Sequence, residues 1–583
     1  MNKLIIAIFT LTLFACDSGK TEDSQADQEI PVPYFLQDST KNQTPTYWEV
    51  IDYWERLSKA SDLVEIEEFG MTDKGLPLHL VHLGSFNSNV ELSEREKPLL
   101  LINNAIHPGE PDGVDACMLV AYDLLRSNSA LLREVDIRII PIYNVGGALN
   151  RNSASRANQN GPAEYGFRGN AQNLDLNRDF VKLDSRNAFS FAELIDRLDP
   201  DFYVETHVSN GADYKYVMTY LASQEDKLDA PLGDFMRSKM NGNMVVNMAN
   251  LGFEMVPYVN VHGVPPDDGY STFYDSPRFS TGLLSLLQTP GYITETHMLK
   301  PVGQRVEATR QFIHFTIKLL SENATDLLIS RELAREHVAE ATSINLDWEV
   351  DHERADSIGF EGYEAKYKES PVSGAQRLYY DRESPWGKVI PYYAYMNPAN
   401  SVNYPHAYIL KRGYFQVEER LAAHGVQLDE LSEDTVLQVE VYYIDTFSTG
   451  KQPYEAHYGH YNTRVRQDTQ ELSFQRGDLI VGLKDHRKRL IAELLEPEAP
   501  DSYFNWNYFD AILQQKEWYS PYVFEDKALD ILESDSEKKE AFDRLLEQEE
   551  FANSPRARIH WVYMHSEHYE PEHLRYPVFR IIN

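Results

Sequence analysis

Two side chains that could hold a metal ion stand three positions apart in the first half of the chain. They are His107 and Glu110, in the tetrapeptide His-Pro-Gly-Glu that follows the apolar run at 99–102. Imidazole nitrogen and carboxylate oxygen are both ligands of Zn²⁺ in tetrahedral protein sites. A catalytic zinc takes three protein ligands and keeps one position open for water, so the pair predicts a third ligand elsewhere. Read alone, the motif would be an ordinary turn with a solvated glutamate.

The best candidate for the third ligand is His207. The segment 201–207 alternates, which places Tyr203, Glu205 and His207 on one face of a predicted strand, with His207 at its end. Without the first pair, His207 would be read as a histidine bonded to a backbone carbonyl. A later predicted strand, 291–300, carries Glu295 near its end. A lone glutamate there would simply be solvated, so Glu295 gains a role only in combination.

A polar pair that suits a carboxylate follows a long loop. Residues 151–173 are rich in Asn, Arg and Gly and lead to Asn177 and Arg178. Loops of this length are commonly functional or disordered. A guanidinium can clamp a carboxylate through two hydrogen bonds, and the amide adds a directional one. Read alone, the pair would be the solvated end of a surface loop.

The elements that must position these residues are strands that end at one edge of a sheet. The run at 99–102, stopped by Pro108 and Gly109, indicates a buried strand that ends in a turn. Ligands of open α/β sheets bind at the carboxyl ends of the strands. Strand and helix signals alternate over 46–60, 63–69, 78–83, 112–125, 135–143 and 302–320. This alternation predicts an α/β fold over residues 45–325, with a mixed, largely parallel sheet and helices on both faces.

The remaining part, residues 326–583, is predicted to be a β-rich α+β accessory region. Strands are expected at 437–444 and 557–564, and helices at 506–515 and 534–551. The sequence there offers no metal or nucleophile constellation. We therefore expect this region to act as a scaffold or to position substrate.

The composition and the amino-terminal sequence limit which partners and which location the protein can have. The chain has 583 residues and a net charge of −36, which predicts several domains and argues against nucleic acid as a partner. Residues 1–15 resemble an export signal peptide that ends in a bacterial lipobox, Leu-Phe-Ala-Cys, with Cys16 as the lipidated residue. Residues 16–44 are expected to be an acidic tether. The membrane is then contacted only through a lipid anchor, in the bacterial cell envelope and facing the periplasm. Cys117, on the apolar face of a predicted helix, is expected to be a buried thiol.

Taken in order, these residues resemble the zinc metallocarboxypeptidases. The match consists of His-Pro-Gly-Glu at 107–110, Asp-Leu-Asn-Arg at 175–178, the strand-end His207 and the late Glu295. The resemblance covers about residues 45–325 and implies one Zn²⁺ per chain. It implies that His107, Glu110 and His207 bind the zinc and that Asp175 orients a zinc-bound histidine, His107.

The resemblance also implies a reaction, in which a zinc-bound water attacks the scissile amide of a peptide. Glu295 would be the general base and would then protonate the leaving amine. Asn177 and Arg178 would hold the terminal carboxylate of the substrate. Arg168 is the nearest match for the arginine that stabilises the oxyanion, with Arg156 as the fallback.

The chain departs from the family pattern in three places. Thr-His follows Glu295, and the same Glu-Thr-His stands at 205–207, so His297 as ligand with Glu205 as base is an alternative. The tyrosine that covers the substrate is not fixed by a motif, and Tyr270 and Tyr274 are both candidates. No acid stands at 279–282, which disfavours basic C-terminal residues, whereas Arg278 leaves an acidic preference open.

Three functions compete at this stage. The first is a cell-envelope zinc carboxypeptidase that removes C-terminal residues from peptides. The second is an amide hydrolase acting on peptidoglycan stem peptides or N-acyl amino acids through the same zinc site. The third is a binding protein without catalysis, against which Glu295 argues because a binder does not need a base.

Overall fold

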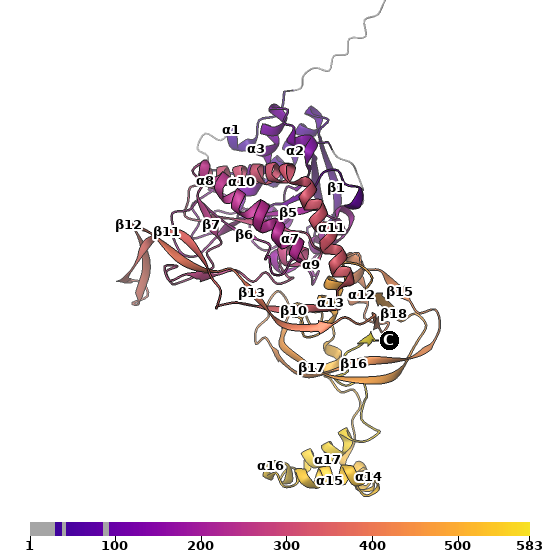
Figure 1. Cartoon of the computed structure of the whole chain (residues 1–583). Coiled ribbons are helices and arrows are strands. Elements are labelled where there is room, and N and C mark those ends of the chain that lie inside the picture. Colours follow the sequence, from indigo (N-terminus) through magenta and orange to yellow (C-terminus); the bar gives the residue numbers. More distant parts are fainter. Residues whose placement is uncertain (1–28, 38–41, 86–91, 583) are drawn as a thin grey trace, which may run out of the picture.

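A computed structural model describes residues 29–37, 42–85 and 92–582 (Figure 1). Its first large unit is built on an eight-stranded sheet in the order β1-β2-β4-β3-β5-β9-β6-β7. Neighbouring strands are parallel in the pairs β4-β3, β3-β5, β5-β9 and β6-β7 and antiparallel in the other three. The strands are β1 (Val64–Met71), β2 (Pro77–Leu83), β3 (Leu99–Asn103), β4 (Asp136–Ile140), β5 (Phe202–Ser209), β6 (Met218–Ala222), β7 (Met255–Pro257) and β9 (Gly291–His297).

Helices cover both faces of this sheet, as its sequence requires. Every residue of β3, β4 and β5 is buried, so neither face of the sheet centre can be open to water. The main covering helices are α2 (Tyr47–Ala60), α3 (Asp112–Arg126), α6 (Arg186–Leu198), α10 (Val302–Glu322) and α11 (Ala324–Glu340). The first of these begins at a capping box, in which Thr46 and Glu49 bond each other's backbone N–H. The predicted mixed α/β sheet is confirmed, and α11 continues beyond the predicted boundary at 325.

The second large unit is rich in strands, also as predicted. Its six-stranded sheet has the order β15-β18-β14-β19-β16-β17. The strands are β15 (Leu428–Glu430), β18 (Leu479–Gly482), β14 (Ala407–Leu410), β19 (Val578–Ile581), β16 (Thr435–Thr449) and β17 (His460–Phe474). A long hairpin of β11 (Asp356–Glu369) and β12 (Gln376–Tyr393) projects from the side of the molecule in Figure 1. It joins the first unit through β8 (Tyr270–Ser271), which pairs with β12.

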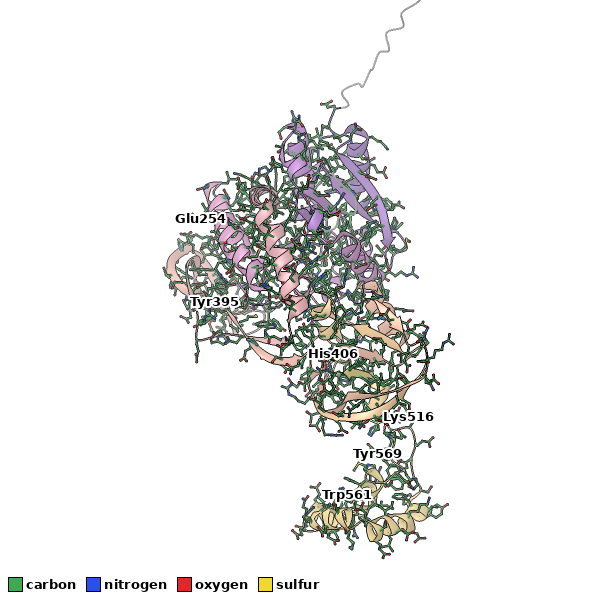
Figure 2. All side chains as sticks on the ribbon, turned by 45° about the vertical axis from the view of Figure 1, so that its right-hand side comes forward. Glu254, Tyr395, His406, Lys516, Trp561 and Tyr569 are labelled. Carbon is green, nitrogen blue, oxygen red and sulfur yellow. The ribbon has the colours of Figure 1, made fainter. Side chains whose placement is uncertain are left out.

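A small helical module stands apart from both sheets (Figure 1). It consists of α14 (Pro521–Ser534), α15 (Ser536–Leu545), α16 (Glu549–Ala552) and α17 (Pro555–Met564), around its own buried cluster. The chain enters and leaves the module at the same place, where the Leu574 N–H donates to the Ile512 carbonyl over 2.9 Å. In Figure 2, Lys516 and Tyr569 lie on the narrow connection and Trp561 lies in the module.

Two predictions for residues 326–583 were wrong. The segment 557–564 is the helix α17 and not a strand. Ser554 caps it by accepting the Ala557 N–H, Pro555 occupies its first turn, and its buried residues Ile559, Val562 and Tyr563 have helical spacing. Residues 506–515 form turns and one short 3₁₀ helix, Asp510–Leu513, in place of the predicted α-helix.

The start of the chain is described only in part. The predicted signal peptide, Cys16 and much of the predicted tether lie outside the described residues. Within residues 29–44, Phe35 packs in a cluster with Leu119 and Val302, and the Thr44 hydroxyl donates to Asp115 over 2.7 Å. None of the helices that the structure describes has the length and apolar character needed to cross a bilayer.

Candidate metal centre and active site

The ends of three neighbouring strands bring the predicted ligands and the predicted base together. His107 lies in the turn after β3, and Glu110 closes that turn by donating its N–H to the His107 carbonyl over 2.8 Å. His207 lies in β5, the neighbour of β3, and is paired in register with Glu295 of β9. The three strands are parallel, so these residues meet at one edge of the sheet, the edge where α/β folds bind ligands.

The side chains of His107, Glu110 and His207 form one buried cluster. One potential ligand atom of each lies within 4.8 Å of the others. Both histidines turn Nδ1 toward the same carboxylate: His107 Nδ1 is 3.3 Å from Glu110 Oε1, and His207 Nδ1 is 2.9 Å from Glu110 Oε2. Two imidazole nitrogens and a carboxylate therefore converge with the donor chemistry of a catalytic zinc site.

The far nitrogen of each histidine is held by a second carboxylate. His107 Nε2 lies 2.9 Å from Asp175 Oδ1, and His207 Nε2 lies 2.5 Å from Glu205 Oε1. Glu205 is itself held by the Tyr203 hydroxyl, which donates over 2.7 Å. Such carboxylate–histidine pairs fix the ring orientation and leave Nδ1 free to bind a metal.

This geometry argues against the alternative in which His297 is a ligand and Glu205 is the base. Glu205 contacts the side of His207 away from Glu110, where it orients the ring, so it is poorly placed to act as a base. His297 has both ring nitrogens engaged, Nε2 with the Ala212 carbonyl at 2.9 Å and Nδ1 with the Leu299 N–H at 3.1 Å. Its side chain is fully buried, and no ring nitrogen is left for a ligand.

Charges around the cluster shift the acid–base equilibria of its members. Burial alone would raise the pKa of Glu110, but Arg156 and His107 together hold that pKa well below its ordinary range. Burial alone would lower the pKa of His207, but the hydrogen bonds that its ring donates to the Glu110 and Glu205 carboxylates raise it well above its ordinary value. Burial raises the pKa of Glu295 to about 8, with His207 opposing and Glu110 adding to the shift.

Two arginines of the loop 151–173 reach the cluster. Arg168 Nη2 lies 2.8 Å from Asp175 Oδ2. Arg156 Nη1 lies 2.7 Å from Glu110 Oε1, and Arg156 Nη2 is buried without a hydrogen-bond partner among the described residues. Gly109 makes room for this loop, since a Cβ there would lie 2.6 Å from Arg156 Nε.

Asn177 and Arg178 follow directly in a short 3₁₀ helix, Leu176–Arg178. Asp175 caps it by accepting the Asn177 N–H over 3.0 Å. The Asn177 Oδ1 atom is buried and has no hydrogen-bond partner in the part of the chain that the structure describes. The half-buried Arg178 guanidinium stacks on Phe279, 4.6 Å from the ring centroid, and pairs with no carboxylate among those described residues. A polar amide and an uncompensated cation thus stand beside the cluster.

The predicted tyrosines point elsewhere, and a different one lies near the site. The Tyr270 hydroxyl donates to the Pro257 carbonyl over 2.9 Å, and the Tyr274 hydroxyl donates to Asp347 over 3.1 Å. Tyr258, just after β7, is close enough to the site that Glu295 and Glu110, after burial, raise its pKa. No motif marks Tyr258, and only its place after a short apolar run could have drawn attention to it.

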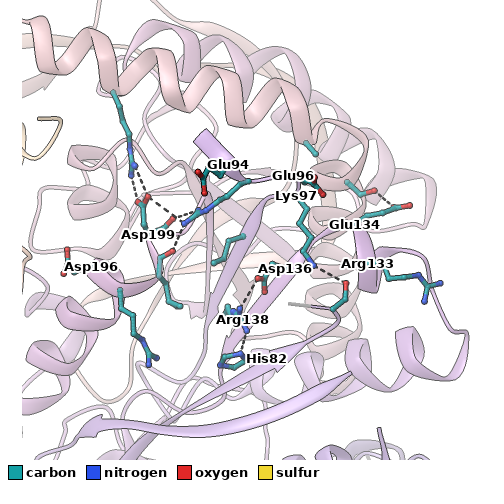
Figure 3. Close-up of a pocket in the computed structure, with 18 of the residues that line it drawn as sticks. His82, Glu94, Glu96, Lys97, Arg133, Glu134, Asp136, Arg138, Asp196 and Asp199 are labelled. Atoms are coloured by element: carbon teal, nitrogen blue, oxygen red, sulfur yellow. Dashed lines mark hydrogen bonds and ion pairs between the residues drawn. The ribbon is translucent and has the colours of Figure 1, made fainter. Parts of the chain in front are cut away.

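A separate charged pocket lies at the opposite edge of the sheet (Figure 3). Its lining includes Leu99, Asp136 and Asp199, which stand at or before the amino ends of β3, β4 and β5. Its charged groups are compensated by one another: Arg95 lies 2.8 Å from Asp201, and Arg138 lies 3.0 Å from Asp136. None of the metal-cluster residues lines it, so we interpret this pocket as structural.

Comparisons with known proteins agree with the site. Residues 50–263 match the family model described as zinc carboxypeptidase. The curated probable carboxypeptidase 2 of Arthroderma benhamiae is 26% identical over 181 residues, which are 30% of this chain and 31% of that protein. Carboxypeptidase 2 of Trichophyton rubrum is 27% identical over 169 residues, 28% of each chain. The match thus spans about a third of the length of these relatives.

The chain is also similar over about half of its length to solved structures of carboxypeptidases. A metallo-carboxypeptidase from Pseudomonas aeruginosa in complex with (2-guanidinoethylmercapto)succinic acid has a TM-score of 0.36 and 12% identity, over 48% of this chain and 68% of that one. Carboxypeptidase A from Helicoverpa armigera has a TM-score of 0.35 and 12% identity, over 49% and 75%.

Proposed function

We propose that this chain is a zinc-dependent carboxypeptidase that removes C-terminal residues from peptides, and the match of residues 50–263 to the zinc carboxypeptidase family model supports this. The observation that carries the proposal is the position of Arg178. A half-buried cation without a carboxylate partner, next to a three-ligand metal cluster, suits the free carboxylate of a peptide end. The buried amide oxygen of Asn177 has no partner either, which supports a ligand at this place.

The residues fit one Zn²⁺ per chain. His107 and His207 would bind it through Nδ1 and Glu110 through its carboxylate, and water or substrate would take the open position. When bound, zinc acts as a Lewis acid that polarises the scissile carbonyl and lowers the pKa of water. Asp175 and Glu205 would keep the two imidazoles in the orientation that this binding needs.

We infer that Glu295 moves the proton. It lies opposite His207 on the adjacent strand, and burial raises its pKa to about 8. In its ionised form, which a bound Zn²⁺ would favour, this carboxylate would accept the proton of the attacking water and then give it to the leaving amine nitrogen. We expect an arginine to stabilise the charge that develops on the carbonyl oxygen. The unpartnered Nη2 of Arg156 supports Arg156 for this role, beside the first candidate Arg168.

The test of exopeptidase action is Arg178→Ala, assayed on one peptide with either a free or an amidated C-terminus. Loss of a desolvated ion pair should lower kcat/KM on the free acid by about 30- to 1,000-fold. Zinc content should stay the same, and cleavage of the amide should change little. Arg186→Ala is the matched control, because that side chain is exposed at the start of α6. If the wild type cleaves both peptides equally, the chain is an endopeptidase or amidase, and this proposal fails.

We also propose that the protein acts in the cell envelope, anchored by a lipid on Cys16 and facing the periplasm. The support is the Leu-Phe-Ala-Cys sequence after an apolar run. Mass spectrometry of the native amino terminus should find acylated cysteine at position 16. A mature protein that begins at another residue would contradict the anchor and leave the zinc site untouched.

A further inference from the structure

The loop between β16 and β17, residues 450–459, reaches from the second unit to the candidate active site. Three of its side chains contact the first unit. The Tyr454 hydroxyl accepts from Arg178 Nε over 2.9 Å, Glu455 Oε2 accepts the Asp175 N–H over 2.8 Å, and His457 Nε2 lies 2.8 Å from Asp184 Oδ2. The loop thus bonds to both ends of the Asp175–Arg178 segment that carries the proposed carboxylate-binding residues.

The tip of this loop adopts a conformation that its sequence does not favour. Tyr454 and His457 bond each other through both backbone pairs, and Glu455 and Ala456 between them have φ values of 48° and 67°. This is a two-residue turn that asparagine and glycine would normally occupy. Non-glycine residues in this left-handed region are destabilised, and they persist where surrounding contacts hold them, commonly at functional sites. Here the contact is the bond from Asp175 to the Glu455 carboxylate.

The Tyr454 hydroxyl has a proton that it could donate to a ligand. A guanidinium carries five N–H donors and no acceptor, so Arg178 can only donate to the Tyr454 oxygen. Two of these donors bond the Tyr454 oxygen and the Asn177 carbonyl, which leaves three for a ligand. The proton of the Tyr454 hydroxyl has no acceptor within the described ranges, and 45% of this residue is exposed. An anionic ligand on Arg178 would supply that acceptor.

The surroundings of Tyr454 are built to hold this geometry. The ring stacks on Trp506, with centroids 6.4 Å apart, and the Arg278 guanidinium lies 5.9 Å from its centroid. Arg278 is compensated by Asp501, whose Oδ1 is 2.8 Å from Nε. Arg278 also hydrogen-bonds the Tyr454 hydroxyl but has its own carboxylate partner, whereas Arg178 forms no ion pair with a carboxylate among the described residues. The pairing with Asp501 also makes Arg278 a weak candidate for selecting acidic C-terminal residues.

We propose that Tyr454 is a substrate-contacting residue and that the second unit completes the subsite for the terminal carboxylate. In this arrangement the Tyr454 hydroxyl accepts from Arg178 and donates to the α-carboxylate of the peptide. Glu455 is a positioning residue that fixes the turn against Asp175. This inference rests on the proposed carboxypeptidase function. It gives the region after residue 340 a direct part in selecting peptides with a free C-terminus.

The experiment compares Tyr454→Phe with Tyr458→Phe in the full-length, zinc-loaded protein. Tyr458 lies in the same loop and is 53% exposed, and its hydroxyl makes no hydrogen bond among the described residues, since only its backbone carbonyl accepts from Asn507; it is therefore a matched control. Tyr454→Phe should lower kcat/KM on the free-acid peptide about 5- to 50-fold, mainly through KM, because a charge-assisted hydrogen bond is lost. Cleavage of the amidated peptide should be unaffected, and Tyr458→Phe should behave as wild type on both.

Two further measurements sharpen the result. In an Arg178→Ala background, Tyr454→Phe should cost less than about twofold, since both groups hold the same carboxylate. The free-acid peptide should also bind the inactive Glu295→Gln protein more weakly when Tyr454→Phe is added, as measured by calorimetry. This second readout does not depend on turnover.

The outcomes separate the two proposals. A wild type that cleaves free-acid and amidated peptides equally contradicts the carboxypeptidase function itself. A selective wild type with a Tyr454→Phe variant indistinguishable from Tyr458→Phe overturns only the role of Tyr454. Faster cleavage by Tyr454→Phe would also overturn it, because the hydroxyl would then be excluding substrate.

Discussion

Each imidazole of the cluster lies between two carboxylates, and this has a measurable consequence for metal affinity. Removing a ligand should abolish binding, whereas removing an orienting carboxylate should only weaken it. We expect His207→Ala to lose about one equivalent of zinc per chain, by elemental analysis. Glu205→Gln should keep its zinc at saturation but release it to a chelator at about 10- to 100-fold lower concentration. Glu254→Gln, at an exposed position, is the control. Equal zinc in wild type and His207→Ala would remove His207 from the site.

At the level of residues, sequence could indicate side chains that stand at strand ends. The sequence predicts that His107, Glu110 and His207 lie together because they stand at the ends of two predicted strands, and the structure does bring them together. Their role as ligands stays a prediction. Glu205 was weighed only as a base, because strand alternation does not tell which nitrogen of a neighbouring histidine a carboxylate contacts. Tyr454 carried no signal at all, since it meets Arg178 across 276 positions.

The helix α12 (Phe415–Ala423) ends in a residue that should make stability depend on pH. His424 is buried, and burial lowers its pKa to about 4. The unfolded chain, with a histidine pKa near 6.5, then binds more protons below that pH than the folded chain does. The free energy of unfolding should therefore fall as pH drops from about 6.5 to 4, with a contribution of about 2–3 kcal/mol from this group. Urea titrations across this pH range should show a shallower slope for His424→Gln, and an unchanged slope would contradict the assignment.

The buried side chain of Arg331 should hold the helix α11 against the sheet. Arg331 is fully buried, with Nη2 2.5 Å from Asp199 Oδ1 and Nη1 2.5 Å from Asp201 Oδ1. Breaking such a pair leaves carboxylates without their partner, which costs about 3–5 kcal/mol. We expect Arg331→Met to lower the thermal midpoint by several degrees, whereas Arg354→Met, at an exposed arginine, should not. Equal midpoints would mean that Arg95 and Arg335 suffice.

At the level of elements, prediction worked where burial and periodicity agreed. The strand β3 is mostly apolar and β5 alternates, both are fully buried, and their positions follow from the sequence within a few residues. The segment 557–564 was misread because its alternating Ile559, Trp561 and Tyr563 also fit a helix that buries residues at positions three and four apart. Ser554 and Pro555, a cap and a first-turn proline, were the local signals for the helix.

For the whole molecule, the helical module should be dispensable. Its ends meet at Ile512 and Leu574, and its buried cluster contains only its own residues. We expect that replacing residues 516–570 by a short Gly-Ser linker leaves zinc content and kcat/KM unchanged. The thermal midpoint of the rest should move by no more than a few degrees. A large loss of activity would show that the module contributes to the site after all.

The loop 450–459 is made long after the other residues of the site, so the parts of the site are synthesised in a fixed order. Tyr454 is made 276 positions after Arg178, which at about 5–20 residues per second is a delay of roughly 15–55 s during synthesis. His207 and Glu295 are made within that interval, so all three predicted ligands, the proposed base and both loop arginines precede Tyr454 and Glu455 in synthesis. If the proposed subsite is right, its carboxylate-binding part is the last part of the site to be synthesised, and selectivity for peptide ends requires the chain to extend past residue 455.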